Sequence, residues 1–208
     1  PLQNHCNSII GVYTSFIFRQ PPTRDLGGLA NDSQVNEILK DADQDGRSFN
    51  QFMKDVSTYS SVFGHTWVIV SKPNVGAITR ADEIAAGVRP YLNQVTPLMV
   101  LDWEWERNAA GKYELCYFKY VEEVNGDTMT IKMWDKDFVE TVTVNEDAAL
   151  LEKSVEPNQL GMIPAVCCYN KRGVIRGIGV SDIGDIADQQ RYIYNLLSEI
   201  EQTVRLDS

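Results

Sequence analysis

The chain has 208 residues, of which 43% are hydrophobic and 23% charged, a composition typical of a soluble globular protein with a buried core. Its formal net charge of −10 argues against a protein that reads nucleic-acid sequence, because such proteins carry basic patches. The charge does not exclude a protein that lets DNA pass without gripping it. No apolar run approaches the ~18 residues of a membrane span, so we expect no membrane contact. The N-terminus lacks a signal-peptide layout, and we expect Pro1 to be an internal or processed start of a fragment.

In residues 1–95 the sequence predicts several helices and, among them in chain order, one strand. Apolar spacing predicts a helix over Leu2–Phe18, which the following Gln-Pro-Pro ends because proline cannot continue it. After a polar loop that reaches Asp32, a short helix is expected over Ser33–Ala42, with Ser33 as a possible N-cap.

A stronger helix follows and leads directly into a strand. Ser48 is expected to cap this helix, which ends near Phe63 with Gly64 as its stop. The β-branched segment His65–Ser71 reads as a strand, and Ala81–Val88 as one or two helical turns. A helix, a glycine and a strand in succession predict helices packed on a sheet.

Residues 96–170 predict an antiparallel meander, which gives an α+β fold overall. Asn125-Gly126 is a hairpin signal, and Asn108–Gly111 is a similar turn region. Glu146–Leu160 is interpreted as a mostly polar connection, and Ile163–Tyr169 as the returning strand. The other predicted strands are Leu98–Trp103, Tyr113–Val121, Thr128–Trp134 and Phe138–Val144.

Residues 171–208 predict a basic loop and one long amphipathic helix, from about Ser181 to Arg205, with Ser181 as its N-cap. The apolar stripe of this helix comprises Ile183, Ile186, Ile193, Leu197, Ile200 and Val204. The opposite face carries Asp185, Asp188, Asn195 and Glu199. A rod of this length at the end of so small a chain suggests a truncated or shared structure.

The segment Asp41–Gly46 matches the first half of a calcium-binding EF-hand loop. Such a loop also needs a bidentate Glu at its twelfth position, and Phe52 stands there. We therefore favour an acidic turn between helices, with Gly46 in a left-handed conformation. A weak cation site remains the alternative.

No other motif predicts a catalytic site, a cofactor or a metal site. The four cysteines lack metal-ligand spacing and are expected to be free thiols, with disulfides as the alternative. His65 is interpreted as a structural histidine. In Trp103–Glu106 the two Trp are expected on one strand face and the two Glu on the other, which fits an edge or interface strand better than a glycosidase pair.

Lys171, Arg172 and Arg176 form the one basic cluster of the sequence. Two interpretations stay open. The cluster is either an ordinary solvated loop, or a loop that contacts an acidic partner surface or nucleic-acid phosphates.

Taken together, four segments resemble bacteriophage portal proteins, the rings that occupy one capsid vertex. The first is the N-terminal helix with Phe-Ile-Phe-Arg-Gln-Pro-Pro (Phe16–Pro22). The second, after the acidic turn, runs from Ser-Phe-Asn-Gln-Phe to Phe-Gly-His-Thr-Trp-Val-Ile-Val (Ser48–Val70). The third is Leu-Met-Val-Leu-Asp-Trp-Glu (Leu98–Glu104), which opens the meander. The fourth is Leu-Gly-Met-Ile-Pro-Ala-Val (Leu160–Val166), followed by the long helix. The series covers nearly the whole chain.

The resemblance implies a non-enzymatic ring of about twelve subunits in the virion, assembled in the host cytoplasm, with an α/β wing and stem helices around a channel for double-stranded DNA. Residues 1–95 and 96–170 would belong to the wing, and 171–208 would supply a basic loop and a stem helix. The implied partners are further copies of the chain, the terminase large subunit, head–tail connector or adaptor proteins and the major capsid protein. Asp185, Asp188 and Glu199 become candidate channel-facing residues. The family's clip, second stem helix, tunnel loop and crown have no counterpart here.

Two other classes of function remain open from the sequence. One is a generic soluble interaction domain, and the other is a small hydrolase whose site carries no recognisable motif.

Overall fold

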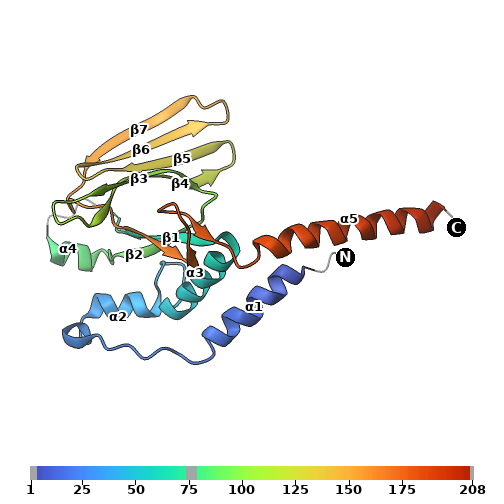
Figure 1. Cartoon of the computed structure of the whole chain (residues 1–208). Helices are drawn as coiled ribbons and strands as arrows, with labels where there is room; N and C mark the ends of the chain where they lie inside the picture. Colours follow the sequence, from blue (N-terminus) through green and yellow to red (C-terminus); the bar gives the residue numbers. More distant parts are fainter. Residues whose placement is uncertain (1–3, 74–78, 207–208) are drawn as a thin grey trace.

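The computed structural model describes residues 4–73 and 79–206 and has an α+β architecture, as the sequence predicted. The body has three layers: a group of helices, a three-stranded sheet and a five-stranded meander (Figure 1). The C-terminal helix leaves this body and projects away from it (Figure 1).

The helical layer matches the predicted helices to within a few residues. The helices are α1 (His5–Ile17), α2 (Ser33–Lys40), α3 (Phe49–Phe63) and α4 (Arg80–Ala85), and a short 3₁₀ turn spans Gly27–Leu29. Leu2, the expected first residue of the N-terminal helix, lies outside the described residues. The predicted cap of α2 was wrong: the Asp32 carboxylate, not Ser33, accepts the backbone N–H groups of Gln34 and Val35.

A single residue, Gly64, connects helix α3 to the first strand of the body. Ser48 and Gln51 form a capping box at the start of α3, and Gly64 ends the helix in the left-handed conformation with φ of 87°. Strand β1 (His65–Ser71) starts at the next residue. The predicted helix, stop and strand are confirmed here.

Strand β1 is the middle strand of the small sheet, between β2 (Tyr91–Val95) and β8 (Ala165–Tyr169), and both pairings are antiparallel. The sequence did not predict β2, whose centre is the polar pair Asn93-Gln94. The returning strand was predicted from Ile163 and begins two residues later.

Both faces of the small sheet are covered, which explains why His65, Thr66, Trp67 and Ile69 of β1 are buried. On one face Phe52 and Val56 of α3 pack with Val68. On the other face Trp67 and Ile69 pack against the meander. The buried residues of this second cluster are Trp67, Ile69, Val95, Leu115, Phe118, Tyr120 and Ile163.

The meander has the strand order β3-β4-β5-β6-β7, so β3 and β7 are its edges. The interpretation of Glu146–Leu160 as a connection was wrong, because β7 lies inside that segment. Every residue of β7 is exposed, so the buried face that usually marks a strand in a sequence is missing. The strands are β3 (Val100–Arg107), β4 (Tyr113–Asn125), β5 (Thr128–Trp134), β6 (Phe138–Asn145) and β7 (Leu150–Pro157).

After β8 the chain forms a small hairpin and then the long helix. The hairpin pairs β9 (Lys171–Arg172) with β10 (Gly179–Val180), so the expected basic loop is in part a strand. The helix α5 spans Gly184–Leu206. The predicted helix is confirmed, but it starts three residues later than expected.

Candidate functional surfaces: the projecting helix and the basic hairpin

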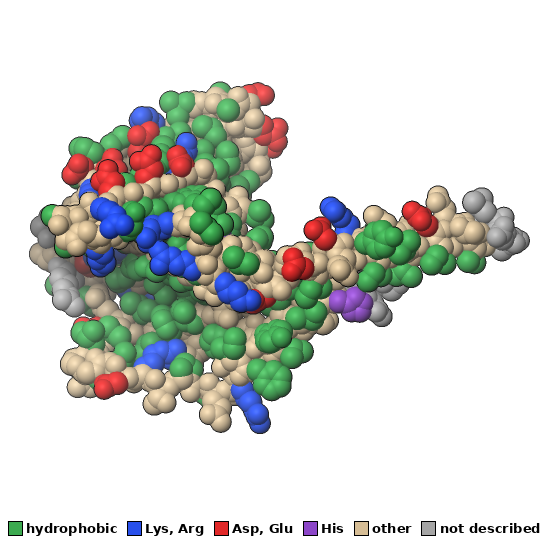
Figure 2. All heavy atoms as spheres, in the orientation of Figure 1, with side chains coloured by type: hydrophobic (Ala, Val, Ile, Leu, Met, Phe, Trp, Pro, Cys, Tyr) green, Lys and Arg blue, Asp and Glu red, His purple; other side chains and the backbone are tan. Residues whose placement is uncertain are grey.

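The outer part of α5 has no cover within the part of the chain that the structure describes. From Arg191 to Arg205 every side chain is exposed. The apolar stripe is exposed with the rest: Ile193 is 49% and Leu197 59% accessible. Figure 2 shows hydrophobic side chains along one edge of the projecting helix and acidic side chains along the other. An uncovered stripe on an ordered helix is an unusual feature for a monomer.

Among the described residues, the contacts between α5 and the body are made by its first turns. The backbone N–H of Cys6 on α1 donates to Gln190 Oε1 at 3.2 Å. A hollow of about 350 Å³ remains between the two helices and the hairpin. Its lining is Ile9, Ile10, Tyr13, Ser61, Lys171, Asp182 and Ile186.

The three predicted channel-facing acids lie on the solvent side of α5. Asp185 stands in the first helical turn, where the helix dipole favours a negative charge. Asp188 pairs with Arg191 at 3.3 Å, and both side chains are largely exposed. Glu199 is exposed as well. They share one face of the helix without forming a cluster.

Ser181 and Asp182, which precede α5, form hydrogen bonds with the C-terminal end of α3. The Ser181 hydroxyl donates to the carbonyl of Val62 at 2.6 Å, and the Asp182 N–H donates to the carbonyl of Ser61 at 3.0 Å. These bonds satisfy carbonyls that a helix end leaves unpaired. The prediction that Ser181 is the N-cap of α5 was therefore wrong. Ser181 caps the C-terminus of α3 instead, and its oxygen accepts the N–H of Ile183.

Gly64 and Gly179 bring the two backbones into direct contact at this junction. A Cβ on Gly64 would lie 2.5 Å from the carbonyl oxygen of Gly179. The Gly179 N–H donates to Nδ1 of His65 at 3.3 Å, and burial lowers the pKa of this histidine. His65 thus has a structural partner, in line with its interpretation from sequence.

The basic cluster divides between two environments. Lys171 forms an ion pair with Asp182 at 2.9 Å. The hydrogen bond from Lys171 lowers the pKa of that carboxyl. The Arg172 guanidinium lies over the Tyr169 ring, with its carbon 5.9 Å from the ring centroid. Arg176 points to the meander instead, so the three side chains do not converge on one site.

Arg176 joins the hairpin to the meander. Its guanidinium carbon lies 3.9 Å from the ring centroid of Tyr113 and 5.5 Å from that of Trp105. Its carbonyl accepts the indole N–H of Trp103 at 3.1 Å. Sequence reasoning missed Tyr113 and its neighbour Arg107, because only the β3–β4 register places them opposite each other.

In the acidic turn at Asp41–Gly46, the carboxylates of Asp41 and Asp43 bind backbone N–H groups and arginine side chains of this chain. Asp43 accepts the backbone N–H groups of Asp45 and Arg47 and pairs with the Arg47 guanidinium. Burial acts to raise the pKa of Asp43, but these hydrogen bonds outweigh it and the pKa is lowered. Asp41 binds Arg89 at 2.8 Å. Gly46 has φ of 87°, which confirms its predicted conformation.

The remaining candidates from the sequence are the four cysteines and the segment Trp103–Glu106. All four cysteines are free thiols. Cys167 and Cys168 pack on opposite faces of β8, and burial raises the pKa of Cys167 to about 12. Trp103 and Trp105 pack on the core while Glu104 and Glu106 are exposed, on the edge strand that was predicted. Within residues 4–73 and 79–206, no three His, Cys, Asp or Glu side chains are grouped to hold a metal ion.

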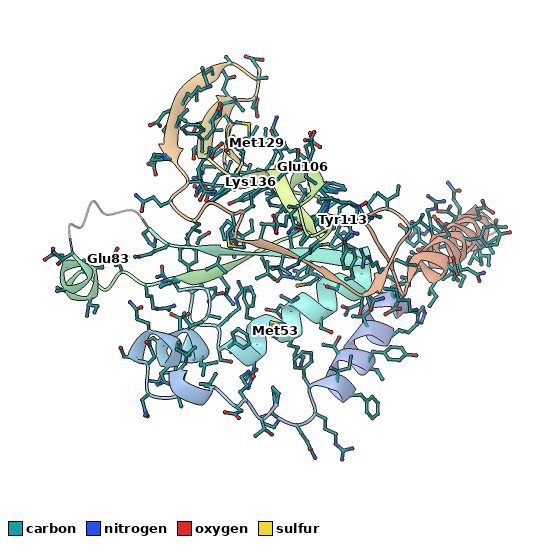
Figure 3. The ribbon with its side chains drawn as sticks, turned by 60° about the vertical axis from the view of Figure 1, so that its left-hand side comes forward. Met53, Glu83, Glu106, Tyr113, Met129 and Lys136 are labelled. Atoms are coloured by element: carbon teal, nitrogen blue, oxygen red, sulfur yellow. The ribbon has the colours of Figure 1, made fainter. Side chains whose placement is uncertain are left out.

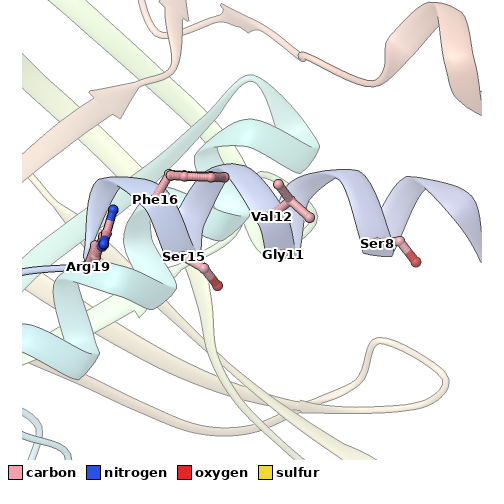
Figure 4. Close-up of a pocket in the computed structure, with 6 residues that line it drawn as sticks. All are labelled: Ser8, Gly11, Val12, Ser15, Phe16 and Arg19. Carbon is pink, nitrogen blue, oxygen red and sulfur yellow. The ribbon is translucent and has the colours of Figure 1, made fainter.

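A second hollow, of about 530 Å³, runs along α1 (Figure 4). All six lining residues belong to this single helix, so the hollow is an open helix face rather than an enclosed site. The lining residues are Ser8, Gly11, Val12, Ser15, Phe16 and Arg19.

No family model matches this chain, and no curated protein matches it. Among the described helices, none combines the length and the apolar character that crossing a bilayer requires.

Proposed function

We propose that this chain is part of a portal-type ring subunit, a structural protein through which double-stranded DNA passes. In this proposal residues 4–169 form a wing-like body and α5 a stem-like helix. The main support is α5 itself, a helix of 23 residues whose apolar stripe, beyond the first two turns, is not covered by any other described part of the chain. In a ring, the same stripe on each copy would be buried against a neighbouring copy.

The charge of α5 supports a conduit rather than a DNA-binding surface. A basic lining would release counterions and hold the duplex tightly, whereas an acidic face keeps it mobile. Asp185, Asp188 and Glu199 give α5 such a face on the side away from the apolar stripe. The proposed partners are further copies of the chain, the terminase large subunit, head–tail connector proteins and the major capsid protein.

The assembly state tests the proposal. Native mass spectrometry of the complete gene product should give a closed ring of about twelve copies, and electron microscopy should show a central channel. A monomer at every concentration would contradict the proposal.

A charge placed on the stripe of α5 should prevent the ring from forming. Leu197 is 59% exposed in the single chain, so Leu197→Glu should leave the fold of the body unchanged while it disrupts contacts between copies. The matched control is Asn195→Glu, which adds the same charge to the opposite face. Sedimentation velocity should show smaller assemblies for Leu197→Glu alone, and equal behaviour of the two variants would refute a role for the stripe.

The acidic face has a separate test. Replacing Asp185, Asp188 and Glu199 with Lys should slow DNA packaging, because the lining would then attract the duplex. Assembly should be unaffected, since the three side chains are exposed and lie away from the stripe. Packaging at the normal rate by such rings would show that this face does not line the channel.

A further inference from the structure

Two arginines without carboxylate partners meet at one tyrosine. The guanidinium carbons of Arg107 and Arg176 lie 4.3 Å and 3.9 Å from the ring centroid of Tyr113. Within the part of the chain that the structure describes, neither arginine has an ion pair with Asp or Glu. In this chain acidic residues outnumber Lys and Arg by 29 to 19, and yet both guanidinium groups lie over a tyrosine ring instead of beside a carboxylate.

The stacking leaves donors free for an anion. The Arg176 guanidinium lies over the rings of Trp105 and Tyr113, and a guanidinium in contact with aromatic rings still carries N–H donors for other partners. Arg107 donates one N–H to the carbonyl of Gly111 at 3.1 Å. Each guanidinium has five N–H donors, so most of them remain available. The Tyr113 side chain lies at the beginning of β4, where Figure 3 labels it.

The position of Arg176 is fixed by its own backbone. Its carbonyl accepts the Trp103 indole N–H at 3.1 Å, and the next residue, Gly177, donates its N–H to the Tyr169 hydroxyl at 2.7 Å. A hydrogen bond from Arg107 to the Tyr113 side chain, together with the charges of both arginines, lowers the pKa of Tyr113. A donor set that is held in place before binding loses less entropy when a ligand arrives.

Apolar side chains adjoin this site. Val174 is fully exposed and Ile175 is 62% accessible, and both directly precede Arg176 in the hairpin. A protein segment that reaches Arg176 would therefore also find exposed apolar side chains in the same hairpin. Duplex DNA offers phosphates but no apolar side chain to pack on Val174 and Ile175, whereas an acidic protein segment offers both an anionic group and an apolar side chain.

We propose that Arg107, Tyr113 and Arg176 form a carboxylate clamp that binds an acidic segment of a protein partner. The segment carries Asp or Glu next to an apolar residue: the carboxylate accepts hydrogen bonds from the guanidinium groups, and the apolar side chain packs on Val174 and Ile175. The clamp rests on these side chains alone and is independent of the portal proposal.

Fluorescence anisotropy with two labelled, terminally blocked hexapeptides tests the clamp on the complete chain. The first peptide alternates Leu and Glu, and the second alternates Leu and Gln. We expect the Leu-Glu peptide to bind about tenfold more tightly or better, because a charge-assisted pair is lost in the second peptide. Equal binding of the two peptides, or displacement of the Leu-Glu peptide by a short DNA duplex at lower concentration than by unlabelled peptide, would overturn the proposal.

Single substitutions test whether the peptide binds at these two arginines. Arg107→Gln and Arg176→Gln should each weaken binding of the Leu-Glu peptide about tenfold, whereas Arg19→Gln, which removes an exposed charge on α1, should not. Arg176→Gln could also loosen the hairpin, so Arg107→Gln, which does not hold the hairpin, decides the case. Unchanged affinity in Arg107→Gln would refute the clamp.

Discussion

Gly64 shows how one residue can connect two distant parts of the chain. Its φ of 87° ends α3, and its missing side chain lets the backbone of Gly179 approach. A Cβ would lie 2.5 Å from the Gly179 carbonyl oxygen and 2.8 Å from the Ser181 nitrogen. The sequence predicted the helix stop, but the second role depends on a residue more than a hundred positions away.

Replacing Gly64 with Ala should destabilise the chain more than a replacement at an unobstructed left-handed glycine. The matched control is Gly111→Ala, with φ of 76° and no atom within 4 Å of its new Cβ. The control should lose about 1–2 kcal/mol of the free energy of unfolding, from backbone strain alone. Gly64→Ala should lose more, because backbone atoms must also move. Urea denaturation measures both, and equal losses would argue against the close contact.

His65 makes the α3–α5 junction sensitive to acid. Burial lowers its pKa in the folded chain below the ordinary value of 6.5. The unfolded chain therefore binds the proton first, so stability is full above about pH 6.5 and falls as the pH drops toward the folded pKa. His65→Asn keeps an acceptor for the Gly179 N–H but cannot titrate.

The pH dependence can be measured by urea denaturation at pH 7.5 and pH 5.5. The loss of stability between the two should be smaller in His65→Asn than in the parent chain. His5→Asn, at an exposed position on α1, serves as the control and should retain the full loss. An identical loss in His65→Asn and the parent would exclude His65 as its source.

At the scale of elements, α5 combines two environments in one helix. Its first turns contact α1 and the capped end of α3, while residues 191–205 are exposed throughout. A half-helix without tertiary contacts is marginally stable in water. The two halves should therefore differ in how readily they open.

Hydrogen exchange followed by mass spectrometry should show this difference in the monomeric chain. Backbone amides of residues 192–205 should exchange much faster than those of α3, whose residues Phe52 and Val56 are buried. If copies associate through the stripe of α5, the same amides should become protected in the assembly. Strong protection of residues 192–205 in a dilute monomer would contradict an uncovered helix.

Elements were predictable where an apolar stripe or a turn signal marks them in the sequence. The stripe of α3 and the turn signals of the meander meet this condition, and both were predicted correctly. The edge strand β7 has no buried face, so its sequence resembles a polar connection. Strand β2 is five residues long and includes Asn93 and Gln94, too few apolar positions for a pattern to emerge.

For the whole molecule, the packing of the two sheets on each other decides stability. Trp67 of the small sheet contacts Phe118 of the meander, with ring centroids 4.6 Å apart. Phe118 and Tyr120 are completely buried between the sheets. The cluster draws on residues from before and after position 95, so the two sheets share one core.

Phe118→Ala should therefore destabilise the whole body, by about 3–5 kcal/mol. The matched control within the meander is Phe138→Ala, at a position that is 52% exposed, where the loss should be small. Urea denaturation followed by tryptophan fluorescence and by far-UV circular dichroism should show the transition of the body shift in both signals. A change confined to one signal would mean that the sheets unfold separately.

The sequence by itself determined the α+β class, most helices and strands, the helix stop at Gly64 and the amphipathic character of α5, because these depend on neighbouring residues and on local periodicity. Only the tertiary structure decided which surfaces those elements share. Ser181 caps α3 instead of α5, and Arg176 reaches Tyr113 across the meander, because both contacts join residues far apart in the chain. Periodicity fixes which face of an element is apolar, but only folding brings two distant faces together.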